Sequence, residues 1–289
     1  MESGIIVKGI GGFYDVLLED RIVQCIARGK FRKTGLVPMV GDYARISSAN
    51  GTIEEILPRK NQLLRPPVAN IDYLGVVIAV KEPEPDFMLV DKLFISAESM
   101  KIHPMLIINK IDLAEGDDVL KIRRAYDKTG YPIVEISSKF GIGIESLKAA
   151  MQPGIFTLAG QSGVGKSSIL NCLLPGLSLE TREISNKIKR GRHTTRAVEL
   201  LRFSREIMVV DTPGFSAIEM SRLEEEELQD YYPEFRLYKG QCRFSSCVHH
   251  HEPECMVKQM VEEGKISEDR YLRYLKILSE VKENRRDDW

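Results

Sequence analysis

Residues 160–167 read GQSGVGKS, and this stretch decides the fold. It matches the pattern G-x-x-x-x-G-K-[ST], follows the apolar run IFTLA (155–159) and precedes SILNCLL (168–174), which is compatible with a helix. A strand, a glycine-rich turn and a helix in this order form a phosphate-binding loop. The chain is therefore expected to hold a nucleoside triphosphate by its phosphates.

The residues of this loop have distinct expected roles. Gly160, Gly163 and Gly165 let the backbone wrap close to the phosphates, so that its N–H groups point inward at a helix N-terminus. Lys166 is expected to bring its charge to the β and γ phosphates as a catalytic group, and Ser167 to ligate Mg²⁺. The remaining members of the expected nucleotide-binding loop are Gln161, Ser162, Val164 and Ser168.

A second motif, DTPG (211–214), follows the apolar run IMVV (207–210). An aspartate at the end of a strand beside a phosphate-binding loop can hold Mg²⁺ through water, which is the role expected of Asp211. Gly214 is expected to offer its N–H to the γ-phosphate and to move when that phosphate leaves. Alone, this tetrapeptide is also a good turn. After a phosphate-binding loop, it indicates a magnesium site.

A third motif, NKID (109–112), follows the apolar run MLII (105–108). Asp112 can accept hydrogen bonds from the N1–H and the exocyclic amine of guanine, a pattern that adenine lacks, so the motif predicts selectivity for guanine. Asn109 is expected to brace the loops, Lys110 to lie over the base, and the loop with Ser137 and Ser138 to contact the guanine O6. In isolation, NKID fits a strand end followed by a helix cap equally well.

The order of these motifs is unusual, because the base motif precedes the phosphate-binding loop by about fifty residues. All of them sit at the ends of predicted strands, where open α/β sheets bind ligands. Moving NKID and the loop with Ser137 and Ser138 to the end restores the usual order of a GTP-hydrolysing domain. A circular permutation does this while keeping every strand neighbour. The alternation of strands and helices thus predicts an α/β fold with a parallel, doubly wound, circularly permuted sheet.

The polar stretch 184–200 lies between the phosphate-binding loop and DTPG. It contains Thr194 and Thr195, one of which should ligate Mg²⁺ in the triphosphate state; Thr195 is favoured and Thr194 stays open. Phe215 stands where other GTPases carry a glutamine that orients water, and phenylalanine cannot do so. His193 is the candidate for this catalytic role, and the alternative is a group supplied by a partner. The basic residues of this stretch could touch RNA or could simply be solvated.

Residues 1–68 are expected to form an OB-like barrel that binds RNA. The runs FYDVLL, RIVQCIA, DYARIS and TIEEIL predict short strands separated by glycine-containing turns. The basic segment RGKFRK (28–33) contains Phe31, a mixture that suits a nucleic-acid-binding barrel or a solvated hairpin tip. RPPVANID (65–72) is expected to be a linker because of its two prolines. The expected domains are 1–68, the permuted domain 69–225 and a metal-binding domain 226–289.

The last domain contains the pattern C-x4-C-x-H-x5-C, formed by Cys242, Cys247, His249 and Cys255. Three thiolates and one imidazole make a closed tetrahedral zinc site, which is structural rather than catalytic. His250 and His251 are spare imidazoles that leave the fourth ligand open. The following segment, 267–282, places apolar side chains at helical spacing and predicts a helix packed along one face.

Composition restricts the possible partners and the location of the protein. The net charge is −1, so a polyanionic partner must meet a local patch. The longest apolar runs, such as LGVVIAV (74–80), are well short of the roughly 18 residues that a membrane span needs. No signal peptide is recognised. We therefore expect a cytoplasmic monomer without membrane contact.

Together, the motifs resemble the RsgA (YjeQ/YloQ) family of circularly permuted ribosome-assembly GTPases. The resemblance rests on VGD (40–42), NKID, GQSGVGKS, GRHTT (191–195), DTPGF (211–215) and the cysteine–histidine pattern, and it covers nearly the whole chain. It implies a slow GTPase, stimulated by the small (30S) ribosomal subunit and acting late in its maturation. It also implies that the barrel and the zinc domain contact ribosomal RNA, and that His193 is catalytic.

The sequence is compatible with two functions. Either GTP hydrolysis to GDP times release from the small subunit, or the protein is a GTP-gated RNA chaperone in which hydrolysis is incidental. A metal-delivery GTPase is disfavoured by the closed zinc site. Because the chain leaves the nucleotide domain soon after DTPG, loss of the γ-phosphate at Gly214 could also reposition the zinc domain.

Overall fold

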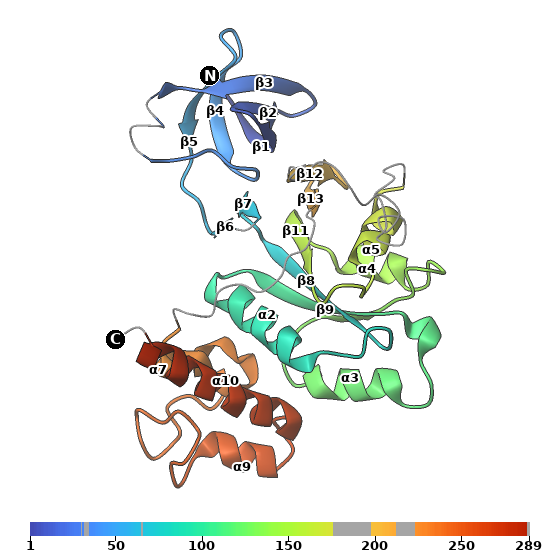
Figure 1. Cartoon of the computed structure of the whole chain (residues 1–289), viewed down its shortest axis with the longest axis vertical. Coiled ribbons are helices and arrows are strands. Elements are labelled where there is room, and N and C mark those ends of the chain that lie inside the picture. The colour runs from blue at the N-terminus through green and yellow to red at the C-terminus, as the bar shows by residue number, and fades with distance from the viewer. Residues whose placement is uncertain (30, 32–34, 65, 176–197, 212–222, 288–289) are drawn as a thin grey trace. The chain divides into compact units, whose positions relative to one another are not determined.

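The computed structural model describes the chain except residues 30, 32–34, 65, 176–197, 212–222 and 288–289 (Figure 1). The chain divides into two compact units. One contains Met1–Leu74, Met151–Leu158 and Leu170–Phe215, and the other contains Gly75–Ala150, Ala159–Ile169 and Ser216–Trp289. The expected His193, Thr194, Thr195, Gly214 and Phe215 lie outside the described residues.

The first unit begins with a five-stranded barrel (Figure 1, blue). Its strands are β1 (Glu2–Ile10), β2 (Phe13–Leu17), β3 (Ile22–Ala27), β4 (Tyr43–Ser47) and β5 (Thr52–Ile56). They pair in the order β1-β2-β3-β5-β4, and β4 returns to pair with β1, which closes the barrel. The expected small closed barrel is confirmed, and closure removes the exposed edges of the sheet.

The interior of the barrel corrects one expectation about RGKFRK. Phe31 is only 6% exposed and packs in the barrel core with Ile6, Ile46 and Ile53. Its ring therefore contributes to the apolar core and is not available to stack on a base. The sequence of this segment does not tell whether Phe31 is buried in the core or exposed for base stacking, because phenylalanine suits both positions.

The expected linker at 65–72 is wrong for the residues that the structure describes there. β7 (Pro67–Ala69) pairs with β6 (Gln62–Leu64), and Pro67 is tolerated because it opens its strand. Asn70 is buried; its Nδ2 donates to the Gly41 carbonyl at 2.9 Å, and its Oδ1 accepts from the Lys60 N–H at 2.8 Å. This segment is therefore held to the barrel by hydrogen bonds and is not a free linker.

Parallel pairing appears in both units, as the alternation of strands and helices predicted. In the first unit, β13 (Ile207–Asp211) is parallel to β11 (Gly154–Ala159) and antiparallel to β12 (Glu199–Arg202). In the second unit, β9 (His103–Asn109) lies between β8 (Tyr73–Ala79) and β10 (Ile133–Glu135), and β10 is parallel to β9. The helices that alternate with the strands are α2 (Phe87–Ser99), η1 (Ile111–Leu113), α3 (Asp118–Tyr126), α4 (Ile144–Ala150) and α5 (Lys166–Leu173).

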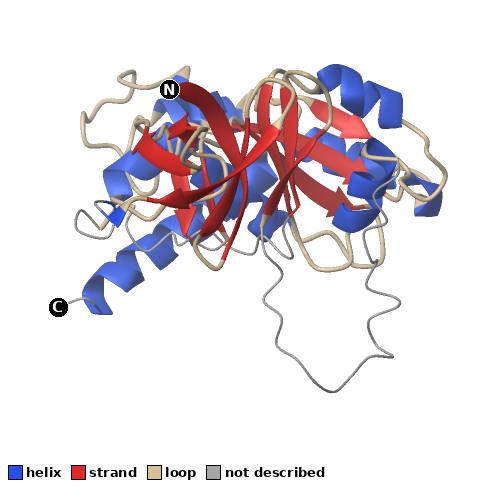
Figure 2. Ribbon diagram, turned by 90° about the horizontal axis from the view of Figure 1, so that it is seen from above, coloured by secondary structure: helices blue, strands red, loops and turns tan. Residues whose placement is uncertain are grey.

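The second unit ends in a helical module, here called the C-terminal module (226–289). Its elements are α7 (Glu225–Leu228), which begins one residue earlier, η2 (Gln229–Tyr231), α8 (Pro233–Arg236), α9 (Met256–Glu262) and α10 (Glu268–Asp287). The expected apolar stripe is confirmed, since Tyr271, Tyr274, Leu278 and Val281 are buried on α10. This long helix lies next to the C-terminal end of the chain (Figure 2). No described helix is long and apolar enough to cross a membrane.

Two features of the structure show why position 41 needs a glycine. Gly41 has a φ of +89°, and a Cβ built on it would lie 2.1 Å from the carbonyl oxygen of Ala69 in β7. We expect Gly41→Ala to destabilise the chain by about 2–5 kcal/mol, the combined effect of left-handed strain and steric overlap. Urea unfolding followed by circular dichroism measures this loss.

The matched control is Gly35→Ala. Gly35 also has a positive φ, +70°, but nothing lies within 4 Å of its built Cβ. This substitution should cost only the strain of about 1–2 kcal/mol. Equal losses for the two variants would contradict the close approach of Gly41 to β7.

Candidate nucleotide site and metal centre

The phosphate-binding loop follows β11 and leads into α5, as GQSGVGKS predicted. Its three glycines have positive φ values, and two of them lie against neighbouring backbone or side chains. A Cβ at Gly160 would lie 2.2 Å from the Val77 carbonyl oxygen, and one at Gly165 would lie 2.4 Å from the Asn109 Nδ2. A side chain at either position would therefore push the loop away from its neighbours.

The polar groups of this loop take defined positions. The Lys166 Nζ donates to the carbonyl oxygens of Gly160 and Gln161 at 2.7 and 2.8 Å, so the ammonium lies over the loop that it belongs to. Ser167 and Ser168 are half-buried in the first turn of α5. Val164 is buried. Ser162 and Gly163 are exposed.

Asn109 joins the base motif to the phosphate-binding loop. It is fully buried at the end of β9, and its Nδ2 donates to the Val164 carbonyl at 2.7 Å and to the Ser138 Oγ at 3.1 Å. Its Oδ1 accepts from the Ser138 N–H at 3.0 Å. One side-chain amide thus connects three segments that are distant in the sequence, as expected of a bracing residue.

Asp112 and Lys110, the two charged residues of the expected base site, are also held in place by hydrogen bonds. The Ser137 Oγ donates to the Asp112 Oδ1 at 2.5 Å, which orients the carboxylate on η1. Lys110 has a left-handed backbone with a φ of 62°, and its Nζ donates to the Glu82 carbonyl. The structure therefore gathers Asn109, Lys110, Asp112, Ser137 and Ser138 with the phosphate-binding loop in one compact unit.

The expected magnesium and catalytic groups are only partly described. Asp211 is the last residue of β13, and its side chain lies outside the described residues. The same holds for His193, Thr195 and Gly214. Their roles rest on the motif order alone.

The connection between β8 and α2 was not singled out in the sequence. Glu82 accepts from Lys110, and the Cδ of Pro83 lies 3.7 Å from a Cβ built on Gly163. Lys81 forms ion pairs with Glu115 at 3.0 Å and with Asp118 at 3.2 Å. These bonds raise the pKa of Lys81 above its usual value. The run KEPEPD (81–86) directly after a strand was the available signal.

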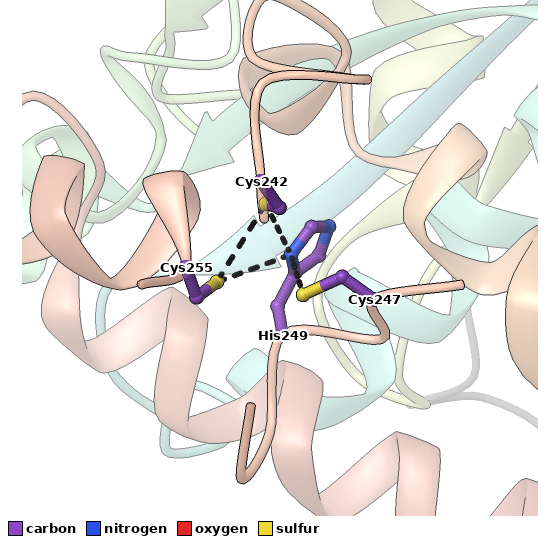
Figure 3. A group of neighbouring side chains, drawn as sticks. All are labelled: Cys242, Cys247, His249 and Cys255. Atoms are coloured by element: carbon purple, nitrogen blue, oxygen red, sulfur yellow. Dashed lines mark hydrogen bonds between the residues drawn. The ribbon is translucent and has the colours of Figure 1, made fainter. Parts of the chain in front are cut away.

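The C-terminal module brings the cysteine–histidine pattern together (Figure 3). The His249 Nδ1 lies 3.6, 3.4 and 3.3 Å from the sulfurs of Cys242, Cys247 and Cys255, and the Cys242 and Cys255 sulfurs are 3.9 Å apart. Four donors around one zinc ion at the usual bond lengths are separated by about 3.8 Å for two sulfurs and about 3.5 Å for sulfur and nitrogen. The four donors therefore fit a tetrahedral zinc ion.

The surroundings of the cluster favour coordination by His249. Its Nε2 lies 2.9 Å from the Gln229 Oε1, so a proton on Nε2 leaves Nδ1 free to bind a cation. Burial lowers the pKa of His249 and raises that of Cys247 to about 12. Without a cation the buried thiols keep their protons, whereas a divalent metal stabilises the thiolates. His249 is thus assigned to the cluster, and His250 and His251 lie outside it.

Two family models match the barrel and the nucleotide domain. Residues 56–221 match the model described as RsgA GTPase, and residues 3–53 match the RsgA N-terminal domain. The small ribosomal subunit biogenesis GTPase RsgA of Caldanaerobacter subterraneus subsp. tengcongensis is 47% identical over 284 residues, 97% of this chain and 96% of the relative. RsgA of Alkaliphilus metalliredigens is 44% identical, covering 99% of this chain and all of the relative (100%).

Two solved structures share the fold over nearly the full length. YjeQ from Thermotoga maritima superposes with a TM-score of 0.84 at 40% identity, covering 97% of this chain and 98% of the other. YloQ, described as a circularly permuted GTPase, gives a TM-score of 0.83 at 36% identity, covering 98% and 96%. The permuted motif order, the barrel and these similarities show that the chain belongs to the RsgA family of circularly permuted small ribosomal subunit biogenesis GTPases.

Proposed function

We propose that this protein binds the 30S subunit, assists its late maturation, and couples its own release to hydrolysis of GTP to GDP. The observation that carries this proposal is the amide of Asn109, which joins the guanine motif to the phosphate-binding loop despite the permuted order. The relatives are small ribosomal subunit biogenesis GTPases, and this supports the ribosomal partner. We infer three domains, 1–68, 69–225 and 226–289, working as a cytoplasmic monomer.

The proposed roles within the nucleotide site follow from chemistry. Lys166 neutralises charge on the β and γ phosphates, and the backbone of 160–165 surrounds them. Asp112 recognises guanine, with Ser137 holding the carboxylate in orientation. Mg²⁺ bound with GTP is assigned to Ser167, Thr195 and Asp211, where it supplies charge stabilisation during phosphoryl transfer.

His193 is the proposed group that positions or activates the attacking water. Phe215 follows DTPG and cannot orient water, so this role must come from elsewhere. His193 stands directly before the two threonines of which one is the expected magnesium ligand. The alternative is that the small subunit supplies the group in trans.

The metal is proposed to be a single structural zinc ion held by Cys242, Cys247, His249 and Cys255. Four protein donors fill a tetrahedral shell and leave no position for water or substrate. The ion would tie the loop 242–255 to α9, since Cys255 directly precedes that helix.

The barrel is the proposed RNA-binding domain. Ile10, Phe13 and Ile26 are direct cross-strand partners on β1, β2 and β3 and are 57%, 53% and 47% exposed. We call this row the barrel platform. An exposed ring on such a surface can stack on unpaired bases. Residues 1–68 contain ten Lys and Arg against seven Asp and Glu, whereas 226–289 contain eleven against fourteen, so charge favours RNA contact by the barrel.

Hydrolysis provides the first test of the proposal. Purified protein should hydrolyse GTP slowly, faster with small subunits, and should leave ATP intact because adenine cannot satisfy Asp112. His193→Ala should lower subunit-stimulated turnover by about 10²-fold or more. Phosphate release measured with and without subunits decides both points.

The same variant separates the two candidate functions. If hydrolysis times release, His193→Ala protein should stay on subunits in the presence of GTP. Normal release by a variant that does not hydrolyse GTP would instead favour a GTP-gated RNA chaperone. Absence of any stimulation by subunits would remove the enzymatic proposal.

Metal content tests the zinc assignment. The wild-type chain should carry about one zinc ion, and Cys255→Ser should carry almost none, because the lost thiolate opens a closed shell. Cys172→Ser is the matched control, since Cys172 lies outside the cluster. Mass spectrometry of metal per chain measures this, and zinc retained by Cys255→Ser would contradict the ligand set.

The barrel platform is tested by Phe13→Ser. Loss of one stacked base should weaken binding to small subunits by about 1–3 kcal/mol, which corresponds to a factor of roughly 5 to 150. Val37→Ser is the control, because Val37 is 66% exposed and lies outside the platform. Sedimentation with small subunits measures both, and equal affinities for Phe13→Ser and wild type would exclude the platform.

A further inference from the structure

Two arginines of α10 meet one carboxylate on α2. Asp91 is fully buried; its Oδ1 accepts from the Arg270 Nη1 at 2.6 Å and its Oδ2 from the Arg273 Nε at 2.5 Å. Arg270 is 1% exposed and also bonds Glu234 on α8. Charges buried to this extent are tolerated only when they are paired, so the cluster constrains how the C-terminal module packs on α2.

The two guanidinium groups also lie over aromatic rings at the beginning of α2 and the end of α3. The Arg273 guanidinium is 5.3 Å from the centroid of Phe87 and 5.7 Å from that of Tyr126. Arg270 is 5.5 Å from the Tyr126 centroid. The Tyr126 hydroxyl donates to the Phe87 carbonyl at 3.3 Å, and the two rings stack. The arginine pair, Arg270 and Arg273, therefore contacts both helices where they meet.

These two helices border the guanine motif. α2 begins at Phe87, directly after the connection whose Glu82 carbonyl accepts from Lys110. The other end of that connection is held by the Val80 N–H, which donates to the Asn109 carbonyl at 3.0 Å. α3 begins at Asp118, which pairs with Lys81 at 3.2 Å. A shift of either helix would thus displace residues that frame 109–112.

We propose that the arginine pair of the C-terminal module positions the guanine motif by clamping α2 and α3. A contact on the C-terminal module would then alter nucleotide release through Asp91. This inference rests on the proposed guanine-binding function. The C-terminal module would thus be coupled to the nucleotide site through the guanine motif. This coupling is separate from any movement of the module caused by loss of the γ-phosphate at Gly214.

The test replaces Arg273 and keeps the rest of the cluster. In Arg273→Gln, Asp91 stays paired with Arg270 and Arg270 keeps its contact with Tyr126, so the module should fold. Only the contacts of the Arg273 guanidinium with Phe87 and Tyr126 are lost. Release of a fluorescent GDP analogue from the full chain should become roughly two- to thirtyfold faster, the range seen for residues that couple distant sites.

The matched control lies on the same two helices. Lys92 on α2 pairs with Glu280 on α10 at 2.5 Å, but the two side chains are 32% and 47% exposed. Exposed ion pairs contribute little, so Lys92→Gln should release the analogue at the wild-type rate. A similar acceleration in Lys92→Gln would overturn the specific role of the arginine pair.

Thermodynamic linkage supplies a second readout. If the state of the module changes the binding free energy of GDP, then GDP binding must change the free energy of that state by the same amount. Hydrogen exchange of the α10 amides should slow when GDP binds the wild type, and this response should shrink in Arg273→Gln.

Besides the Lys92→Gln control, four further results would count against the proposals, and they are distinguishable. Unchanged release by a metal-retaining Arg273→Gln overturns the clamp. So does faster release accompanied by loss of metal, because the arginine would then only hold the module folded. So does an α10 response to GDP that is the same in wild type and variant. Failure of the wild type to bind the analogue overturns the proposed function instead.

Discussion

The buried amide of Asn109 is the contact on which the nucleotide site depends. Its Nδ2 bonds the Val164 carbonyl in the phosphate-binding loop and the Ser138 hydroxyl, and its Oδ1 bonds the Ser138 N–H. A buried amide left without partners is costly, so the three segments are held at hydrogen-bond distance. Gly165 follows from this constraint, because a Cβ there would occupy the space of the amide. The expected base motif and the phosphate-binding loop are thereby held next to each other.

Circular permutation has a structural consequence beyond the order of motifs. The chain leaves the nucleotide domain after DTPG and forms the C-terminal module, whose core includes Ile95 of α2. The same interface contains Arg270, fully buried between Asp91 and Glu234. Removing one partner of such a buried ionic cluster is strongly destabilising, because it leaves a buried charge unpaired. The metal cluster and the nucleotide motif are therefore parts of one compact unit.

The barrel shows how apolar residues on one sheet divide between core and surface. Side chains alternate along each strand, so Val16 faces the core while Phe13, three positions earlier, faces solvent. Phe31, which comes from the segment after β3, fills the interior. The segment expected to be a linker is instead packed against the barrel, because Asn70 satisfies backbone groups at Gly41 and Lys60.

The sequence by itself determined the phosphate-binding loop, the guanine motif, their permuted order and the three cysteine donors of the metal cluster, because each depends on residue types at fixed spacing. It also predicted the closed barrel, the alternating strands and helices and the buried stripe of α10. Only the tertiary structure decided that Phe31 is buried, that residues 67–72 are packed, and that His249 rather than its neighbours joins the cysteines. These outcomes, like Gln229 beside His249 and Asp91 between two arginines, depend on contacts between residues far apart in the chain, which local periodicity does not encode.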